Sequence, residues 1–166
     1  MDIKKTINLL ESSIKNPSKG LPEDVFLFIS RITPLINVDL LIKNKQGHTL
    51  LTWRDDACFP AGWHIPGGII RYKEKISNRI YAVAKNELGV SVRFKRDPLA
   101  INQVIYNSRK TRGHFISLLY ECKLVGSLDE NLKFEKGAPK AGQWAWHKKC
   151  PNNIISVHKM YRKFIN

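Results

Sequence analysis

The segment from Gly67 to Gly89 constrains the fold of this chain more than any other part of the sequence. Two adjacent glycines lead through a short polar stretch into residues 74–88, where apolar residues recur at helical spacing. These apolar residues are Ile76, Ile80, Val83, Ala84 and Leu88. Gly89 then follows as a typical helix stop. Because paired glycines let the backbone approach a ligand closely, the segment predicts a loop and helix beside a binding site.

Strand-like sequence lies on both sides of this predicted helix, and further helices are expected near both ends of the chain. Val38–Ile42 and His48–Trp53 flank a glycine-containing turn at residues 44–47, which predicts a β-hairpin. The other strand candidates are residues 90–94, 101–106, 114–124 and 143–147. The other helix candidates are residues 2–15, 21–32 and 154–164. This order of elements predicts an α/β protein with a mixed sheet packed between helices.

The size and the cysteine content of the chain narrow the class of protein. A chain of 166 residues is long enough for one ordinary domain. No apolar run approaches the roughly 20 residues that span a bilayer, and the N-terminus lacks the pattern of a signal peptide. We therefore expect a cytoplasmic protein without membrane association. Cys58, Cys122 and Cys150 are too few and too scattered for a disulfide framework, so reduced thiols are expected.

The formal net charge of +14, from 28 basic and 14 acidic residues, favours anionic partners. The basic residues are spread along the chain without a block of five, which weakens the case for a nucleic-acid-binding arm. A phosphate-containing small molecule fits this charge, and a solvated lysine surface is the alternative. Nucleic acid remains a partner that the sequence permits but does not favour.

Glu87 lies near the end of the predicted helix and can face the Gly67-Gly68 loop. A carboxylate and backbone carbonyls are oxygen ligands of the kind that a hard divalent cation prefers. A tight turn into an ordinary helix with one surface glutamate is the alternative, and these residues alone favour it.

Gly68, Glu74 and residues 82–90 resemble the Nudix box, whose pattern is G-x5-E-x7-R-E-U-x-E-E-x-G-U with U an aliphatic residue. The spacing fits throughout, and Glu87 occupies the position of the last glutamate. The chain departs from the pattern at Ala82, Val83 and Asn86. The resemblance implies a Nudix α/β/α sandwich with a mixed β-sheet over residues 19–166, and an N-terminal helical extension over residues 1–18.

The same loss of box glutamates is found in one Nudix branch, the GDP-mannose mannosyl hydrolases. The similarity to this branch continues at Thr33-Pro34-Leu35, Asp39, Arg54, Gly62–Gly68, Trp146 and Val157-His158. It implies an Mg²⁺-dependent homodimeric hydrolase in which water attacks the anomeric carbon of GDP-mannose and GDP leaves. By position it assigns Mg²⁺ to Gly67 and Glu87, and catalysis to Arg54 and Glu87. It assigns substrate contacts to Leu21, Phe26, Asp39 and Arg54, with the first two acting partly across the dimer interface.

Several residues depart from that branch. Ile69 replaces an arginine, and Phe115 replaces a tyrosine. Lys140 and Ala141 stand where the branch has a metal-binding glutamine and a base histidine, and Gln143 is a substitute ligand if the loop is reshaped. His64 and His114 are candidates for a relocated base, although a structural role is the first reading for both. Since the box arginine is absent, Glu74 is either solvated or paired with Lys75, Asn78 or Arg79.

These departures leave three functions open. Hydrolysis of a nucleoside diphosphate sugar is the leading one. A Nudix domain that binds a nucleotide sugar or RNA without turnover is the alternative from another class. A conventional pyrophosphohydrolase is disfavoured because Val83 and Asn86 replace box glutamates.

Overall fold

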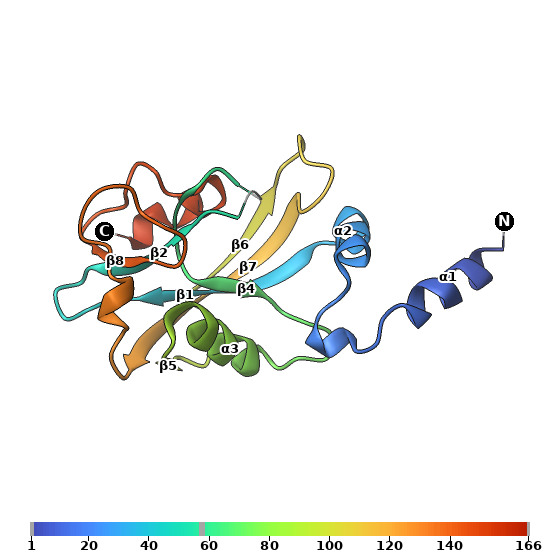
Figure 1. The fold of residues 1–166 in the computed structure, drawn as a ribbon, viewed down its shortest axis with the longest axis horizontal. Helices are drawn as coiled ribbons and strands as arrows, with labels where there is room; N and C mark the ends of the chain where they lie inside the picture. The colour runs from blue at the N-terminus through green and yellow to red at the C-terminus, as the bar shows by residue number, and fades with distance from the viewer. Residues whose placement is uncertain (1, 57–58, 166) are drawn as a thin grey trace.

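The computed structural model describes residues 2–56 and 59–165 as a mixed α/β architecture (Figure 1). Its α-helices are α1 (Ile3–Ser12), α2 (Glu23–Ile32) and α3 (Ile76–Leu88). Short 3-10 helices are η1 (Pro17–Lys19), η2 (Glu130–Leu132) and η3 (Ser156–Phe164). The helix α3 buries Ile80, Val83, Ala84 and Leu88 of the predicted apolar face, whereas Ile76 in its first turn is exposed. It ends at Gly89, whose φ of 71° is left-handed.

The strands form two sheets. In the five-stranded sheet, β1 (Leu35–Ile42) pairs antiparallel with β4 (Gly67–Ile69) and parallel with β7 (His114–Val125). The far edge of β7 pairs antiparallel with β5 (Ser91–Phe94) and β6 (Ala100–Ile105). In the three-stranded sheet, β2 (Thr49–Arg54) lies between β3 (Gly62–His64) and β8 (Trp144–His147). The expected α/β fold with a mixed sheet is confirmed.

The predicted hairpin at residues 38–53 is correct only at its turn. The backbone N–H groups of Asn44 and Gly47 donate 3.0 Å bonds across that turn, to His48 and Asn44. The strands themselves diverge, because β1 and β2 belong to different sheets and only an isolated bridge, Lys43 with Thr49, joins them. β7 pairs along one edge of β1, and β4 pairs with residues 37–39 on the other edge.

The predicted last helix is a 3-10 helix rather than an α-helix. His158 and Tyr161 are buried three residues apart, and Phe164 packs partly on the same core. A spacing of three brings these side chains onto one face of a helix with three residues per turn. This face packs against the core of the protein.

Two apolar clusters hold the elements together. The helix α3 packs Ile80, Val83, Ala84 and Leu88 against the sheet residues Val38 and Leu40. The second cluster joins the two sheets to η3 and includes Leu41, Leu51, Ile65, Leu119 and Tyr161. Between these two clusters, β1, β4 and α3 meet the three-stranded sheet. The site described below lies at this junction.

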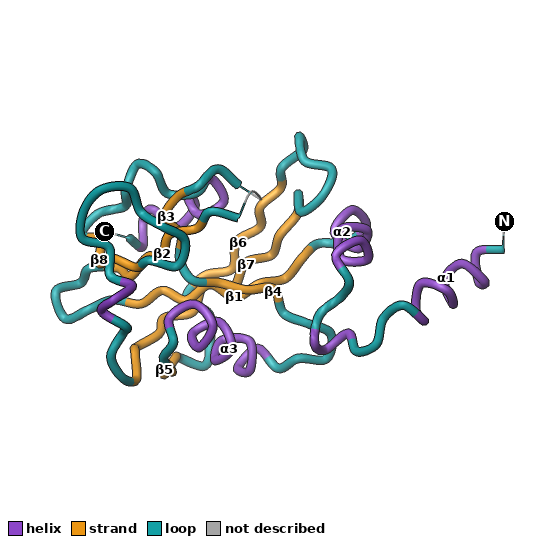
Figure 2. Tube along the Cα trace, viewed as in Figure 1, coloured by secondary structure: helices purple, strands orange, loops and turns teal. Residues whose placement is uncertain are grey.

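The N-terminal helix α1 projects from the body of the protein (Figure 2). All of its residues are described, and none is buried. Within residues 2–56 and 59–165, no helix combines the length and apolar character needed to cross a membrane. Cys122 and Cys150 are free thiols, whereas Cys58 lies outside the described residues.

Candidate active site

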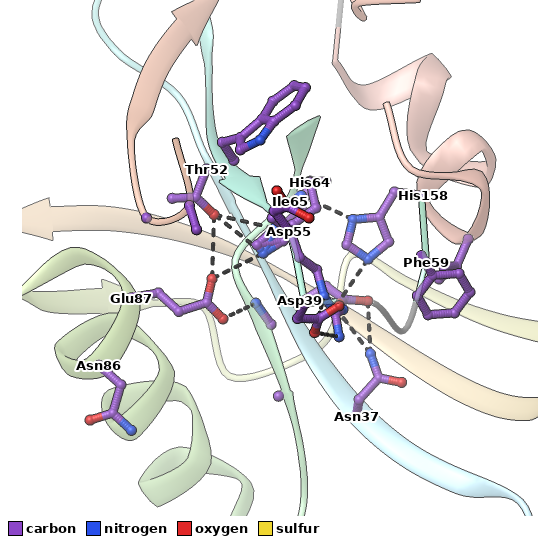
Figure 3. Close-up of a pocket in the computed structure, with 18 of the residues that line it drawn as sticks. Asn37, Asp39, Thr52, Asp55, Phe59, His64, Ile65, Asn86, Glu87 and His158 are labelled. Carbon is purple, nitrogen blue, oxygen red and sulfur yellow. Dashed lines mark hydrogen bonds and ion pairs between the residues drawn. The ribbon is translucent and has the colours of Figure 1, made fainter. Parts of the chain in front are cut away.

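A pocket of about 550 Å³ opens at the junction of the two sheets and α3 (Figure 3). Each of the main elements around it contributes at least one polar group to the lining. These groups are Asp39 of β1, Arg54 of β2, His64 of β3, Gly67 of β4, Glu87 of α3 and His158 of η3. The pocket therefore gathers side chains that are far apart in the sequence.

Glu87 projects from the last turn of α3 and is bonded on both carboxylate oxygens. Its Oε1 accepts a 3.1 Å bond from the N–H of Gly67, and its Oε2 accepts a 3.3 Å bond from the Thr52 hydroxyl. The Nε2 atom of His64 lies 3.2 Å from the same Oε2. Burial raises the pKa of Glu87 to about 7, although these hydrogen bonds act in the opposite direction.

The paired glycines are required by the packing of the pocket wall. A Cβ atom on Gly67 would collide with the carboxylate of Asp39 and lie 3.0 Å from the carbonyl of Val38. A Cβ atom on Gly68 would lie 2.8 Å from a methyl group of Val83. The close approach expected of these glycines therefore brings β4 against β1 and α3, which places the Gly67 backbone beside both carboxylates.

Asp39 is buried at the centre of a hydrogen-bond network under the pocket. The Asn37 amide, two residues away on the same face of β1, donates 3.0 Å bonds to both carboxylate oxygens. Tyr161 donates to Oδ2, and the Ser117 hydroxyl in turn donates to Asn37. Burial raises the pKa of Asp39 to about 7 despite these donors. Asp39 and Glu87 thus both titrate near neutrality.

Two histidines complete the lining as neutral imidazoles. The Nδ1 atom of His158 accepts a 2.9 Å bond from the N–H of Ile65, so the ring proton is on Nε2, which lies 3.8 Å from Oδ1 of Asp39. The rings of His64 and His158 stack at 5.9 Å. Burial lowers the pKa of His64 to about 3 and that of His158 well below its ordinary value. Neither ring carries a positive charge at neutral pH.

Arg54 lies at the rim of the pocket and already has a carboxylate partner. Its Nε donates a 2.7 Å bond to Oδ2 of Asp56, and the two side chains form an ion pair. The guanidinium also lies 5.7 Å from the centre of the Phe59 ring, which lines the pocket as well. Arg54, the last residue of β2, therefore lines the pocket while it is bonded to Asp56 in the loop that follows.

The structure brings together four of the six residues that the sequence assigned to the site: Asp39, Arg54, Gly67 and Glu87. Leu21 and Phe26 are not among the described residues that line the pocket of this single chain. His114 and Gln143 also lie outside that lining. His114 is within 3.0 Å of Gln103, and the side-chain oxygen of Gln143 accepts a bond from the backbone of Lys140.

Sequence reasoning missed three groups of the site: Asn37, Tyr161 and Arg112. Asn37 has a local signal, since it stands two residues before Asp39 on a strand and shares its face. Tyr161 and Arg112 have none, because their partners Asp39 and Ser30 are 122 and 82 residues away along the chain.

Comparison with known proteins shows which fold family this structure resembles. No protein-family model matches the chain. The low-salt glycan biosynthesis protein Agl8 of Haloferax volcanii is 29% identical over 123 residues, covering 72% of this chain and 76% of Agl8. The crystal structure of a MutT NUDIX hydrolase from Burkholderia pseudomallei matches with a TM-score of 0.59 at 16% identity, covering 81% of this chain and 99% of that one. An ADP-ribose pyrophosphatase from Streptococcus suis matches with a TM-score of 0.55 at 17% identity, covering 80% and 87%. The chain has the Nudix hydrolase fold.

In this Nudix fold, Glu74 is paired rather than solvated. Its carboxylate accepts 2.9 Å and 3.0 Å bonds from the guanidinium of Arg79 and a 2.9 Å bond from the backbone of Arg71. Of the partners considered from the sequence, Arg79 is the one that the structure selects. Because Arg79 is buried on α3, the pair ties the loop after Gly67-Gly68 to the helix that carries Glu87.

Proposed function

We propose that this protein is an Mg²⁺-dependent hydrolase of a nucleoside diphosphate sugar, with GDP-mannose as the first candidate and GDP and free mannose as its products. The carrying observation is that α3 contributes one carboxylate, Glu87, to the pocket. Asn86 lines the pocket beside it as an amide, and Val83 lies in the core. This sparse set of ligands supports a reaction other than the cleavage of a pyrophosphate bond by several clustered metal ions.

The donor set fits one magnesium ion. Within the described residues, no group of three His, Cys, Asp or Glu side chains is placed to hold a metal. Mg²⁺ does not need such a cage, because it commonly binds through one or two carboxylates and keeps several waters. Glu87 suits it, since its partly buried carboxylate lines the pocket and is bonded by the neutral Gly67 N–H and Thr52 hydroxyl. The Gly67 carbonyl is the second ligand we propose.

When bound, Mg²⁺ supplies positive charge to the diphosphate as negative charge develops on the leaving group. The Arg54 guanidinium offers further N–H donors to the same phosphates. In the proposed reaction the bond between the anomeric carbon and the β-phosphate oxygen breaks, and its electron pair leaves with GDP. Water supplies the new oxygen on the sugar. The attacking water releases its proton to solvent, and Asp39 lines the pocket as a substrate contact.

A sugar-containing substrate is also consistent with the relative Agl8, whose name places that protein in glycan biosynthesis. The alternative from another class is a domain that binds a nucleotide sugar, or RNA, without turnover. Ala141 and Gly142 favour it, because they line the pocket in the loop from which the resemblance expects a histidine base. We expect such a loss to slow hydrolysis by about 10²–10⁴ rather than to abolish binding.

The test is product analysis after incubation of the protein with Mg²⁺ and a series of nucleotide sugars. Free sugar and a nucleoside diphosphate support the proposal, whereas GMP and a sugar phosphate would identify a pyrophosphohydrolase. Binding without products would identify the non-catalytic domain. The Glu87→Gln variant is the control for contaminating hydrolases, because it retains the shape of the side chain and loses the carboxylate.

A further inference from the structure

Arg112 contributes to the wall of the pocket from a loop that the sequence analysis did not assign to the site. It lies in the connection between β6 and β7, the yellow loop beyond the ends of these strands in Figure 1. Arg112 lines the same pocket as Arg54 and Glu87, and about a quarter of its side chain is exposed. Besides Arg54, a second arginine therefore lines the site, and it is remote in sequence from the Gly67–Gly89 segment.

One face of α2 fixes Arg112 in this position. The guanidinium donates a 2.7 Å bond to Glu23 and lies 4.7 Å from the centre of the Phe26 ring. The backbone N–H of Arg112 donates a 3.1 Å bond to the hydroxyl of Ser30, which is buried. Glu23, Phe26 and Ser30 are spaced by three and four residues, so they share one side of the helix. The guanidinium is thus held before any ligand arrives.

The backbone of Arg112 is itself in an unfavourable conformation. Its φ of 51° is left-handed, which a non-glycine residue adopts rarely and at an energetic cost. Gly113 follows in a tight turn, where a Cβ atom would lie 2.8 Å from the carbonyl of Arg109. Strain of this kind persists when surrounding contacts fix it, and it is concentrated at ligand-binding sites. Here the contacts of Arg112 with Glu23 and Ser30 fix this conformation and the position of the side chain.

The neighbouring pocket surface lacks phosphate donors at two places. Ile69 and Phe115 both line the pocket, and neither side chain can donate a hydrogen bond. Asp39, Asp55 and Glu87 line it as well, so an anionic ligand needs opposing positive charge there. A guanidinium carries five N–H donors, so Arg112 can engage Glu23 and phosphate oxygens together.

We propose that Arg112 is a diphosphate-binding residue of this pocket, and that α2 serves as the platform that aims it. This inference rests on the proposed function, because it assigns the charged half of the same substrate to a residue outside the Gly67–Gly89 segment. Glu23 and Phe26 are positioning residues, since they act on the ligand through the guanidinium. The assignment also gives Phe26 a role within one chain, by way of Arg112.

The test is calorimetric titration with GDP and with GMP in the presence of Mg²⁺. We expect Arg112→Ala to weaken GDP binding by about 10- to 100-fold, the usual effect of losing a charge-assisted hydrogen bond. The preference for GDP over GMP should shrink, because the lost contact is to the diphosphate. Arg112→Lys should recover part of the affinity but not all, since an ammonium group cannot form two parallel bonds.

The platform is tested by a double-mutant cycle. Phe26→Leu should weaken GDP binding in the parent and have little further effect in the Arg112→Ala background. Arg31→Ala is the matched control, because Arg31 also lies over a phenylalanine ring of α2, Phe28, yet is exposed and outside the pocket lining. It should bind GDP as the parent does. Thermal unfolding of each variant separates loss of binding from loss of fold.

Equal GDP affinity and equal GDP preference in folded Arg112→Ala would overturn the inference, as would a parent protein that binds neither probe. The proposed function fails separately. If the parent binds GDP through Arg112 but releases no free sugar from any nucleotide sugar, the inference stands and the hydrolase proposal falls. If the parent hydrolyses GDP-mannose and Arg112→Ala does so with unchanged KM and kcat, the inference alone falls.

Discussion

The hydroxyl of Tyr161 donates a 2.5 Å hydrogen bond to Oδ2 of Asp39 beneath the floor of the pocket. Tyr161 is fully buried in the C-terminal 3-10 helix, and Asp39 is buried in the central strand β1. The bond therefore attaches the last element of the chain to a carboxylate of the candidate site. Packing of η3 and the chemistry of the pocket depend on each other through this contact.

We expect Tyr161→Phe to lower the free energy of unfolding by about 1–3 kcal/mol, because a buried carboxylate loses a donor and no water replaces it easily. Urea denaturation measures the change. Tyr72→Phe is the control, since 60% of Tyr72 is exposed and its hydroxyl can remain solvated. Equal stability of the two variants would show that the bond contributes nothing to the fold.

The pair formed by Glu74 and Arg79 should matter more to stability than an exposed pair does. Both side chains are largely buried, at 14% and 9% exposure, so Arg79→Met leaves a buried carboxylate without its guanidinium. We expect a loss of about 3–5 kcal/mol in the free energy of unfolding, measured by urea denaturation. Lys95→Met removes the cation from an exposed pair with Glu121 and should cost about 0–1 kcal/mol. The prediction fails if the two substitutions cost the same.

The effect of Mg²⁺ on stability should depend on pH through Glu87. Burial raises its pKa from 4.5 to about 7, so the folded metal-free protein retains a proton there that the unfolded chain has released. The resulting stabilisation is present below about pH 4.5 and is lost as pH rises through about 7. A metal ion needs the deprotonated carboxylate. Addition of Mg²⁺ should therefore raise the Tm more at pH 8 than at pH 6.

The Glu87→Gln variant isolates this effect. The histidines act in the opposite direction, because burial lowers the pKa of His64 to about 3, and its contribution is lost as pH falls below its ordinary 6.5. Because both proteins contain His64, its contribution cancels when the Tm values of the parent and the variant are compared at the same pH. In Glu87→Gln the Tm should no longer respond to Mg²⁺ at either pH, and a response equal to that of the parent would exclude Glu87 as a ligand.

The sequence predicted the parts of the site that local pattern encodes. Apolar residues at helical spacing located α3, and the glycines at 67 and 68 located the backbone that meets Glu87. The order of helices and strands was sufficient for the mixed sheet. In both the helix and the glycine pair the signal lies within a few neighbouring residues. The helix follows from the periodicity of its apolar residues, and the close approach of β4 follows from the missing Cβ atoms of Gly67 and Gly68.

The remaining features depend on contacts between distant segments. The pairing of β1 with β7 rather than β2 joins segments that lie far apart in the chain, and alternation of side chains along a strand does not encode that. Tyr161 bonds to Asp39 and Arg112 is held by α2, and both partners lie far away along the chain. None of these contacts has a local signature, so the sequence alone could not supply them.

We also predict that the protein is a homodimer. The exposed apolar residues of α1, Ile3 and Ile7, repeat every four residues on a helix that buries none of its side chains. Such a stripe is typical of a surface that packs against another protein. Light scattering should give twice the 19.1 kDa chain mass, and replacing Ile3 and Ile7 by Gln should shift the mass toward the monomer. A monomeric parent at high concentration would contradict the prediction.

Arg54 has two possible partners, a phosphate bound in the pocket and the carboxylate of Asp56. Its guanidinium faces the pocket and also binds Asp56, whose side chain is 44% exposed. An exposed ion pair of this kind contributes about 0–1 kcal/mol, so a diphosphate held also by Mg²⁺ can displace or share it at little cost.

We therefore expect Arg54→Ala to weaken GDP binding in the presence of Mg²⁺ by about 10- to 100-fold, and Arg54→Lys to weaken it less. The affinity of Arg54→Ala should also depend less on salt concentration, because one screened attraction is gone. Asp56→Asn separates the two roles of the arginine. If Arg54 binds phosphate, removal of its competing carboxylate should raise GDP affinity whereas Arg54→Ala lowers it, as measured by calorimetric titration. If Arg54 serves only the surface pair, Arg54→Ala will bind GDP as the parent does.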